Sequence, residues 1–449
     1  MTTPVCDFVR SYAASDTVRM HMPGHKGLQI TGPEARDITE IKGAGELYEA
    51  AGPIAEAEAN TAELFGTACS CWSTEGSSQC IRAMLALAAQ SAPGKSRVVL
   101  AARNAHRAFL TACALLDLEV RWLFPQKEND TLCSCLVTAE QVEAALQTLT
   151  QPPAAVYLTS PDYLGGMQDV KQIAERCHAH GVPLLVDNAH GAYLRFLQPS
   201  EHPISLGADL CCDSAHKTLP ALTGCAYLHV SRTAPASFAR EAKRMLALFG
   251  STSPSWLLLQ SLDAVNAELA GEYPLRLRRC IDRLSAMKQR LSRLGWQFTG
   301  QEPLKLTVSA RVCGYTGPEL ADLLRLRKIE CEYADPDYLV LMPSPVSPDA
   351  DLQRLEDALR DLPVRKPLPQ PAFRLPQPER VMSAREAMLA PAEPVLTAQA
   401  EGRILASASM SCPPAVSVYT AGERIGREGL PVLRHYGIDE ILAVKEKDK

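Results

Sequence analysis

The 449-residue sequence has no C-x-x-C pair, no apolar run long enough to cross a membrane and no excess of basic residues. Zinc sites usually draw their ligands from closely spaced cysteine and histidine pairs, so we predict no metal site. Charged residues repeatedly interrupt the apolar stretches, which argues against a transmembrane helix. The formal net charge of −5 provides no basic surface for nucleic acid. This charge suits a cationic substrate but is too small to identify one.

The fifteen cysteines are odd in number, spread along the chain and often placed in apolar segments such as 210–212. This pattern indicates reduced, mostly buried thiols rather than a disulfide framework. At the N-terminus, Asp7 and Arg10 interrupt the sequence before an apolar signal-peptide core is formed. We therefore expect a cytoplasmic protein without a secretory signal.

Between residues 95 and 230, short β-rich apolar runs alternate with helical patterns. This alternation is typical of βαβ units and predicts an α/β domain with a mostly parallel sheet. The predicted strands are 98–100, 120–124, 155–159, 183–187, 210–214 and 226–230. Apolar residues spaced three and four apart predict helices over 141–149 and 170–180.

The chain outside this region divides by composition. Residues 1–50 are rich in glycine and proline and are predicted to be irregular, whereas 54–65 and 236–298 have helical patterns. Six prolines between 363 and 378 predict a linker or surface strap, because proline neither continues a helix nor fits a central strand. The predicted organisation is an N-terminal arm (1–50), a large domain (51–298), a small α/β domain (299–362, with strands at 304–309 and 338–342 and helices at 318–327 and 349–362), a proline-rich linker (363–379) and a C-terminal module (380–449).

The segment 213–218 (DSAHKT) places Lys217 directly after a predicted strand. In open α/β sheets ligands bind beyond the carboxyl ends of the strands, so this lysine is well placed to meet a cofactor. Its amine can form an imine with an aldehyde cofactor if burial suppresses its charge. Ser214 and His216 are placed to bind a phosphate on either side. A solvated lysine in a loop is the alternative that this segment, taken alone, favours.

A carboxylate stands at the end of another predicted strand, where the apolar run 182–186 is followed by Asp187. Pyridoxal 5′-phosphate (PLP) acts as an electron sink only while its pyridine nitrogen stays protonated. A carboxylate ~4–6 Å away typically raises the pKa of such a cation by ~1–3 units, at about 1.4 kcal/mol per unit. Asp187 fits this role, and it is equally compatible with a residue that caps the following turn.

Two further segments add to this constellation. The serine-rich turn 73–78 (STEGSS) precedes a helical pattern over 80–90, and the N–H groups at a helix N-terminus readily bind phosphate. Such a turn also commonly caps a helix without any ligand. His106, shortly after the strand predicted at 98–100, is placed where an imidazole can stack on a cofactor ring. A simple polar surface residue is the alternative for this histidine.

Taken in chain order, these segments resemble the Orn/Lys/Arg decarboxylase family of fold-type I PLP enzymes, which share the aspartate aminotransferase architecture. The resemblance covers roughly residues 18–265 and, more faintly, the C-terminal module. It rests on MPGHKG (22–27), DITEI (37–41), TSPDY (159–163), HKTLPALT (216–223) and STSPS (251–255). It implies a large domain with a mostly parallel sheet, a smaller α/β C-terminal domain and a C-terminal module.

The resemblance also implies a role for individual residues. Lys217 is expected to carry PLP as a Schiff base, Asp187 to bind the pyridine nitrogen and His106 to stack on the ring. The expected phosphate ligands and cofactor neighbours are Gly76, Ser77, Ser78, His190, Ser214 and His216. Since active sites of this fold form between two subunits, Ser251 and Thr252 are expected to reach the partner's phosphate, in an obligate homodimer.

The activity implied by the resemblance is decarboxylation of lysine, arginine or ornithine, as in polyamine biosynthesis. Another PLP reaction, such as transamination or a lyase step, and a catalytically lapsed regulatory homologue are the alternatives. Glu332 and Asp335 are weak candidates for binding a cationic side chain, and a solvated surface position is an equal alternative for both.

The sequence departs from the family pattern at several places. Glu75 stands where the family usually has Asn. The negative charge of its carboxylate is unfavourable beside a phosphate unless the side chain points away. Asn188 replaces a common Glu. We expect a short form without the N-terminal wing of the large members, and 407–418 keeps only part of a proline-rich, acid-containing pattern. This last departure leaves the substrate pocket undefined.

Overall fold

The computed structural model describes residues 1–49, 51–125, 134–369, 375–409 and 416–446. The chain forms two compact units, each assembled from segments that are distant in sequence. The first unit contains residues 1–96, 151–157 and 170–275, and the second contains residues 97–150, 158–169 and 276–449.

A seven-stranded sheet confirms the predicted α/β class. Its strands are β1 (Cys69–Ser73), β2 (Val98–Ala102), β3 (Glu119–Leu123), β4 (Ala155–Thr159), β5 (Leu184–Asp187), β6 (Leu210–Asp213) and β7 (Ala226–Val230), in the order β1-β7-β6-β5-β4-β2-β3. The pairs β2–β3 and β5–β6 are parallel, and β7 is antiparallel to both of its neighbours. The six predicted strands are present, and β1 is the strand that the sequence patterns missed.

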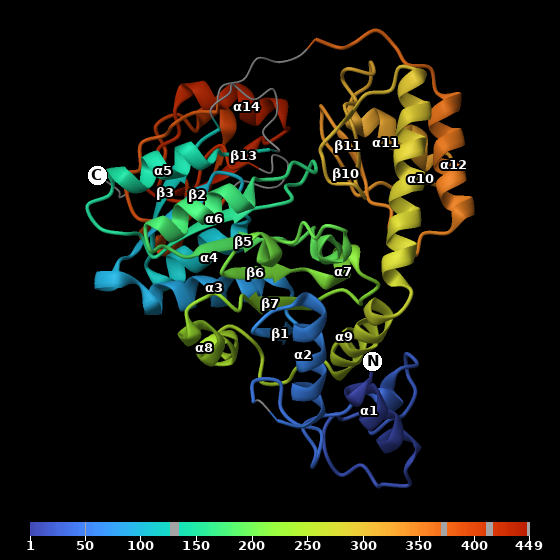
Figure 1. Ribbon diagram of the computed structural model, residues 1–449. Coiled ribbons are helices and arrows are strands. Elements are labelled where there is room, and N and C mark those ends of the chain that lie inside the picture. The colour runs from blue at the N-terminus through green and yellow to red at the C-terminus, as the bar shows by residue number, and fades with distance from the viewer. Residues whose placement is uncertain (50, 126–133, 370–374, 410–415, 447–449) are drawn as a thin grey trace. The chain divides into compact units, whose positions relative to one another are not determined.

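In the first unit, helices α2 (Gly52–Phe65), α3 (Ser77–Ser91), α6 (Val170–Ala179), the short α7 (Ala215–Thr218) and α8 (Ala236–Ala247) pack against its part of this sheet (Figure 1). Helices α1 (Pro4–Ala14) and α9 (Trp256–Ala270) pack against α2 and against each other. Helix α3 contacts β6, β7 and α8, while α2 contacts β1 and α9. The prediction of an irregular segment 1–50 was wrong for α1, in which Val5 and Val9, one turn apart, are fully buried.

The second unit contains a smaller antiparallel sheet of order β10-β11-β9-β8. The strands of this sheet are β8 (Phe298–Thr299), β9 (Leu306–Val308), β10 (Tyr333–Ala334) and β11 (Leu339–Leu341). Helices of the second unit are α4 (Arg107–Leu116), α5 (Ala139–Thr148), α10 (Tyr273–Arg293, which starts in the first unit), α11 (Gly317–Arg325) and α12 (Asp349–Asp361). An ion pair between Arg290 and Glu356 joins α10 to α12, which lie side by side in Figure 1. The predicted strands and helices of 299–362 are confirmed, and β8 and β10 were not predicted.

The C-terminal part of the second unit has its own two-stranded sheet of β12 (Ala392–Leu396) and β13 (Glu440–Val444), with helices α13 (Ala384–Leu389) and α14 (Leu430–His435). Fully buried Arg103 holds it by donating two hydrogen bonds, of 2.7 and 2.6 Å, to Glu423 and one of 2.9 Å to the Ser417 carbonyl. Single-turn 3-10 helices lie at η1 (Glu34–Arg36), η2 (Pro93–Lys95), η3 (Ala192–Phe196), η4 (Pro203–Leu206), η5 (Thr397–Gln399) and η6 (Arg427–Gly429).

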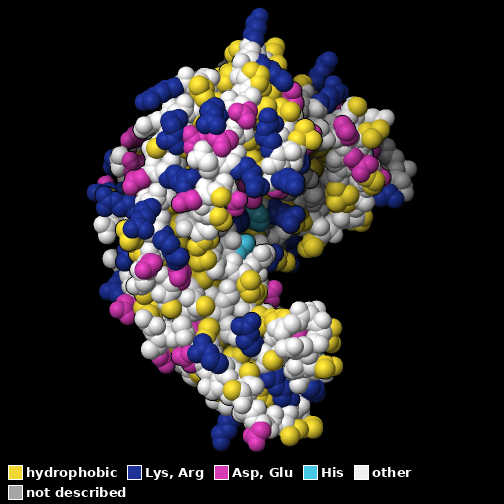
Figure 2. Space-filling model, turned by 90° about the vertical axis from the view of Figure 1, so that its right-hand side faces the viewer, with side chains coloured by type: hydrophobic (Ala, Val, Ile, Leu, Met, Phe, Trp, Pro, Cys, Tyr) yellow, Lys and Arg dark blue, Asp and Glu magenta, His cyan; other side chains and the backbone are white. Residues whose placement is uncertain are grey.

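The surface and the cysteines follow the composition. Figure 2 shows Lys and Arg side chains interspersed with Asp and Glu over the face that it presents. Within the described ranges, no helix combines the length and apolar character needed to cross a bilayer. The cysteines of the described residues form no disulfide, and most of them are buried.

Candidate active site

The carboxyl ends of β5 and β6 lie side by side and carry the two central candidates. Asp187 is the last residue of β5, and it pairs with Cys212 in the register of β6. Its carboxylate is buried, with only 3% of the residue exposed. It accepts hydrogen bonds from the Tyr157 hydroxyl at 3.1 Å and from the Ala189 backbone at 3.2 Å. The Cys212 thiol also donates to it at 3.6 Å. A buried carboxylate held by three donors thus lies at the strand end where Asp187 was predicted to bind a cation.

Lys217 lies in the short helix α7, four residues beyond the end of β6. Its Nζ is 3.2 Å from Nε2 of His190, which follows Asp187 by three residues. Because an ammonium group can only donate, the His190 nitrogen accepts this hydrogen bond. The structure therefore brings Lys217 and His190 together as expected. Lys217 is exposed in the single chain, so this chain alone does not provide the burial that imine chemistry requires.

A group of hydroxyls stands at the start of the 15-residue helix α3. The Ser214 hydroxyl donates to the Ser77 hydroxyl at 2.8 Å, which joins the loop after β6 to this helix. Gly76 has a φ of +71°, and no atom lies within 4 Å of the position where a Cβ would stand. Ser78, the second residue of the helix, is partly exposed. Hydroxyls, an open position and a helix N-terminus together fit a phosphate group.

His216 has a defined hydrogen-bonding pattern. Its Nδ1 is 2.9 Å from the Cys225 carbonyl, so this nitrogen carries a proton and donates. Burial lowers the pKa of His216, although its hydrogen bond to Cys225 opposes this effect. In the neutral ring the other nitrogen can only accept. His216 can therefore donate to a phosphate, as the resemblance implies, only after it takes up a second proton.

His106 belongs to the second unit. It is the N-cap residue of α4, where its Nδ1 accepts a hydrogen bond of 3.2 Å from the Ala108 backbone, and its side chain is exposed. The N-cap role accounts for its position in the chain. Its stacking on a cofactor ring stays a prediction.

The Glu75 carboxylate, which departs from the family pattern, has a hydrogen-bond partner in the same chain. Its Oε1 accepts a hydrogen bond of 3.1 Å from the backbone N–H of Ser251 in the same chain. Ser251, Thr252 and Ser253 are all exposed. The carboxylate thus serves as an acceptor for the 251–255 segment. That Ser251 and Thr252 reach a partner's phosphate stays a prediction.

The candidates for a cationic side chain have different environments. The Asp335 carboxylate is buried and accepts from the Tyr333 hydroxyl and from the backbone of Asp337 and Tyr338, at 2.7–2.8 Å. This turn accounts for Asp335, which is not at the surface. Glu332 is exposed and accepts from the Tyr163 hydroxyl at 3.2 Å. Of the segment 407–418, residues 410–415 lie outside the described residues.

Tyr157 and Asp213 are the polar residues near this site that the sequence patterns missed. Tyr157 lies in the apolar strand β4, where a tyrosine reads as core, although its hydroxyl contacts Asp187. Asp213 was treated as part of the lysine segment. It is fully buried and accepts hydrogen bonds from four side chains.

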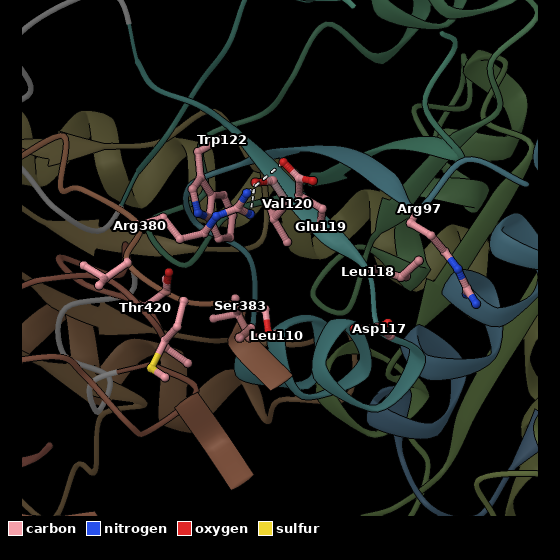
Figure 3. A pocket seen from close by; sticks show the side chains of 14 residues that line it. Arg97, Leu110, Asp117, Leu118, Glu119, Val120, Trp122, Arg380, Ser383 and Thr420 are labelled. Atoms are coloured by element: carbon pink, nitrogen blue, oxygen red, sulfur yellow. Dashed lines mark hydrogen bonds and ion pairs between the residues drawn. The ribbon is translucent and has the colours of Figure 1, made fainter. Parts of the chain in front are cut away.

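A cavity of about 440 Å³ lies in the second unit beside β3, at the edge of the large sheet (Figure 3). Arg380 lines it and bonds to Glu119 at 2.7 Å, with Trp122 next to this pair. Arg380 also donates to the Val120 carbonyl at 3.4 Å, and so covers part of the strand edge. The cavity lining contains none of the residues predicted for the PLP site.

Comparison with known proteins supplies a family match. The family described as "Orn/Lys/Arg decarboxylase, major domain" matches residues 3–313. The chain is 29% identical to the arginine decarboxylase of Bacillus subtilis (strain 168), over 95% of this chain and 92% of that protein. It is 26% identical to the arginine decarboxylase of Bacillus anthracis, over 96% of this chain and 92% of that protein.

Solved structures show the same fold. A lysine decarboxylase from Francisella novicida superposes with a TM-score of 0.80 at 16% sequence identity, covering 99% of this chain and 81% of that chain. The constitutive lysine decarboxylase of E. coli gives a TM-score of 0.78 at 18% identity, covering 100% and 81%. At these identities the likeness establishes the architecture, and the predicted aminotransferase-like class is confirmed.

Proposed function

The chain belongs to the Orn/Lys/Arg decarboxylase family, and from this premise we propose that it decarboxylates arginine with Lys217 and Asp187 as its central residues. Family membership assigns PLP-dependent decarboxylation of a basic amino acid, rather than transamination or another lyase step. Arginine is favoured among the basic amino acids because several relatives matching nearly the whole chain are arginine decarboxylases. The grouping of Lys217, His190 and Asp187 at two adjacent strand ends is the observation that carries the assignment of residues.

PLP, when bound, supplies an electron sink for the electron pair left at Cα when the bond to the carboxylate breaks. The residues fit this group: a lysine to hold the aldehyde carbon, a buried acid for the ring nitrogen and hydroxyls at a helix N-terminus for the phosphate. Asp187 keeps a proton on the ring nitrogen, because a buried carboxylate favours a cation beside it. Ser77 and Ser214 bind and orient the phosphate.

His190 and Lys217 move protons in this proposal. The His190 Nε2 already accepts a hydrogen bond from Lys217, so it can take the proton that the ammonium must lose before the amine reacts with an aldehyde. Lys217, after taking this proton back from His190, would as an ammonium group supply the proton that replaces the lost carboxylate, which yields agmatine from arginine together with carbon dioxide.

We also propose that the active form is a homodimer that completes the site. Lys217 is exposed in the single chain, whereas its chemistry needs a desolvated site. The N-terminal arm presents a row of exposed large apolar side chains, which is typical of a surface that a partner covers. They are Val18, Met20, Met22, Leu28 and Ile30. A second copy of the chain packed on the arm would exclude water from Lys217 and close the side of the site that a single chain leaves open.

The experiment is to incubate purified protein and PLP separately with arginine, lysine and ornithine, and to measure released carbon dioxide and amine. We expect equal amounts of both products, with the largest kcat/KM for arginine. A larger kcat/KM for lysine or ornithine would contradict the choice of substrate. Keto-acid formation without carbon dioxide would contradict decarboxylation, and the absence of any product would support a lapsed homologue.

A further inference from the structure

A line of side-chain hydrogen bonds crosses four adjacent strands of the first unit. Ser70 on β1 bonds to Nδ1 of His229 on β7 at 2.7 Å, and Nε2 of His229 bonds to Asp213 at the end of β6 at 3.2 Å. The other carboxylate oxygen of Asp213 accepts from the Asn188 amide, just beyond β5, at 2.7 Å. These side chains are all buried. The line ends at the residue next to Asp187.

A second histidine completes the shell around Asp213. His202 Nε2 is 3.0 Å from Asp213, and the Ile204 backbone donates to its Nδ1 at 3.3 Å. Nδ1 accepts this bond, so His202 donates to Asp213 through Nε2. Burial lowers the pKa of His229, although its bond to Asp213 opposes this effect. Asp213 is thus a buried carboxylate that accepts from His202, His229, Asn188 and the Cys211 thiol.

The charge of this carboxylate is maintained by its donors. Burial raises the pKa of Asp213, but the electrostatic attraction of His202 and the hydrogen bonds from His202 and His229 outweigh burial and hold the pKa well below its usual range. The Asp213 carboxylate is therefore ionised. Its negative charge strengthens the hydrogen bonds that His202 and His229 donate to it. Replacing it by an amide of the same shape would turn one acceptor oxygen into a donor.

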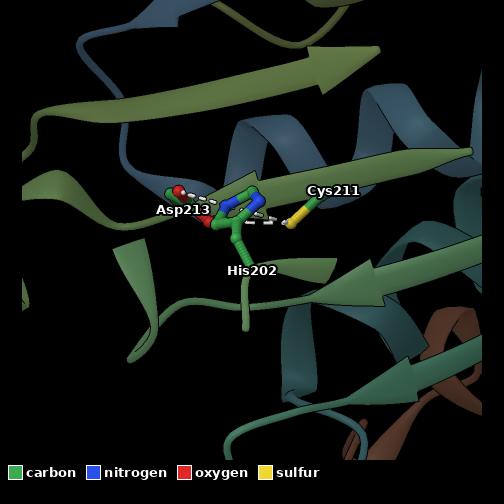
Figure 4. Close-up of side chains that lie close together, drawn as sticks. All are labelled: His202, Cys211 and Asp213. Atoms are coloured by element: carbon green, nitrogen blue, oxygen red, sulfur yellow. Dashed lines mark hydrogen bonds and ion pairs between the residues drawn. The ribbon is translucent and has the colours of Figure 1, made fainter. Parts of the chain in front are cut away.

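The same cluster has a composition that a metal ion can use, and its geometry argues against one. Figure 4 shows the His202 ring between Asp213 and Cys211. The Cys211 sulfur is 3.6 Å from Asp213 and 4.0 Å from His202. Burial raises the pKa of Cys211 well above its usual value, so it stays a thiol that donates rather than a thiolate ligand. The groups satisfy one another without an ion.

We propose that Asp213 is a positioning residue for the cofactor, which acts through Asn188 to hold the end of β5 against the end of β6. This inference rests on the proposed function of Asp187 and Lys217. Asn188 directly follows Asp187, and Asp213 directly precedes Ser214, which starts the turn to Lys217. The acid for the ring nitrogen and the lysine for the aldehyde are therefore joined by the backbone pairing of β5 with β6 and, at its end, by one carboxylate–amide hydrogen bond.

The chain offers a matched control at the amino end of β6. Asp209 is buried, accepts from His178 at 2.9 Å and accepts from the Leu184 backbone, at the start of β5, at 2.8 Å. It thus joins the same two strands through its bond to the Leu184 backbone, at the end away from Lys217, and like Asp213 it pairs with a histidine. Asp209→Asn removes a buried charge without touching the strand ends that carry the proposed site.

The experiment compares Asp213→Asn, Asp209→Asn and wild-type protein. PLP affinity is titrated by visible absorbance, the pH profile of that absorbance is recorded, and apoprotein unfolding is followed by circular dichroism. For Asp213→Asn we expect PLP affinity at least about tenfold weaker and a displaced pH profile, in a folded protein. For Asp209→Asn we expect a lower unfolding midpoint with wild-type affinity and profile.

Each outcome decides something. Equal PLP affinity and equal pH profile in Asp213→Asn and wild type would overturn the positioning role, as would a change of the same size in Asp209→Asn. If Asp213→Asn does not fold, Asn188→Ala, which keeps the carboxylate and its histidines, is expected to show the same loss of affinity, and wild-type affinity there would overturn the role. One bound zinc per chain in the purified protein would overturn the assignment of Asp213 to a hydrogen-bonded network without a metal ion. A wild-type protein that takes up no PLP would instead contradict the proposed function.

Discussion

The two ends of β6 are built from the same kinds of side chains and differ in what they hold. At the amino end, Asp209 joins β5 to β6 and accepts from His178, whose side chain is 44% exposed. At the carboxyl end, Asp213 joins the same strands and accepts from two histidines that are fully buried. An isolated ion pair near solvent contributes ~0–1 kcal/mol, so the amino end needs only backbone pairing and one surface contact.

The difference teaches where this sheet requires precision. Burying several polar groups costs free energy unless each of them finds a hydrogen-bond partner. We therefore expect such a buried network where the relative positions of side chains must be fixed. At the carboxyl end the network is adjacent to Asp187 and Lys217, and at the amino end no predicted site residue is present. Variants at the carboxyl end of β6 should therefore change activity or cofactor binding, whereas variants at the amino end should change stability alone.

The largest effect is expected from Lys217→Ala at the carboxyl end. Loss of the amine removes both the covalent attachment and the proposed proton donor, so kcat/KM for arginine should fall by at least about 10³-fold. Steady-state release of carbon dioxide measures it. Lys171→Ala, an exposed lysine on α6, should retain wild-type activity. Comparable activity in the two variants would remove Lys217 from the mechanism.

The next largest effect is expected from Asp187→Asn. The amide keeps the shape but not the charge that holds a proton on the ring nitrogen, and a loss of ~1–3 pKa units corresponds to about 10- to 1000-fold in kcat. We expect this loss in kcat with a smaller change in KM. Single-turnover carbon dioxide release gives the chemical step. A variant with unchanged kcat would show that Asp187 only caps its turn.

A smaller effect is expected from Ser214→Ala, which removes the hydroxyl that bonds to Ser77. PLP affinity should weaken about tenfold, the value of one lost hydrogen bond to a charged group. The matched control is Ser205→Ala near the amino end, where Ser200 and Ser205 form an exposed hydroxyl pair of 3.0 Å. Titration with PLP compares them. Equal affinities would place the phosphate elsewhere.

The smallest effect concerns pH and His229. Because burial lowers the pKa of His229 in the folded state, the unfolded chain binds more protons below pH ~6.5 and stability is lost as the pH falls. This loss reaches at most about 1.4 kcal/mol per pH unit. In His229→Gln it disappears, so urea unfolding of the apoprotein should depend less on pH between about 7 and 5. A slope equal to that of wild type would indicate that His229 is already charged when folded.

Six strands of the large sheet could be predicted because each is a short, local run of apolar residues. β4 and β7 occupy exactly the predicted residues, 155–159 and 226–230. β1 was missed because its sequence, CSCWS, lacks the β-branched residues that mark a strand. Helix α1 was missed although proline at its start and Val5 and Val9 at helical spacing were available as signals.

The site divides in the same way. Lys217 and Asp187 could be predicted because each stands at the carboxyl end of a recognisable strand. The network around Asp213 could not, because Ser70, His229 and Asn188 come from distant parts of the chain and meet only through the strand order. The stacking of His106 and the reach of Ser251 and Thr252 to a partner depend on contacts between units or chains, and they remain predictions.

The most direct test of this account is to reduce the PLP-loaded protein with borohydride and to map the labelled peptide. We expect one pyridoxyl group per chain, on Lys217, with labelling lost in Lys217→Ala and retained in Lys171→Ala. A label on a different lysine, or none in a protein that releases carbon dioxide from arginine, would contradict it.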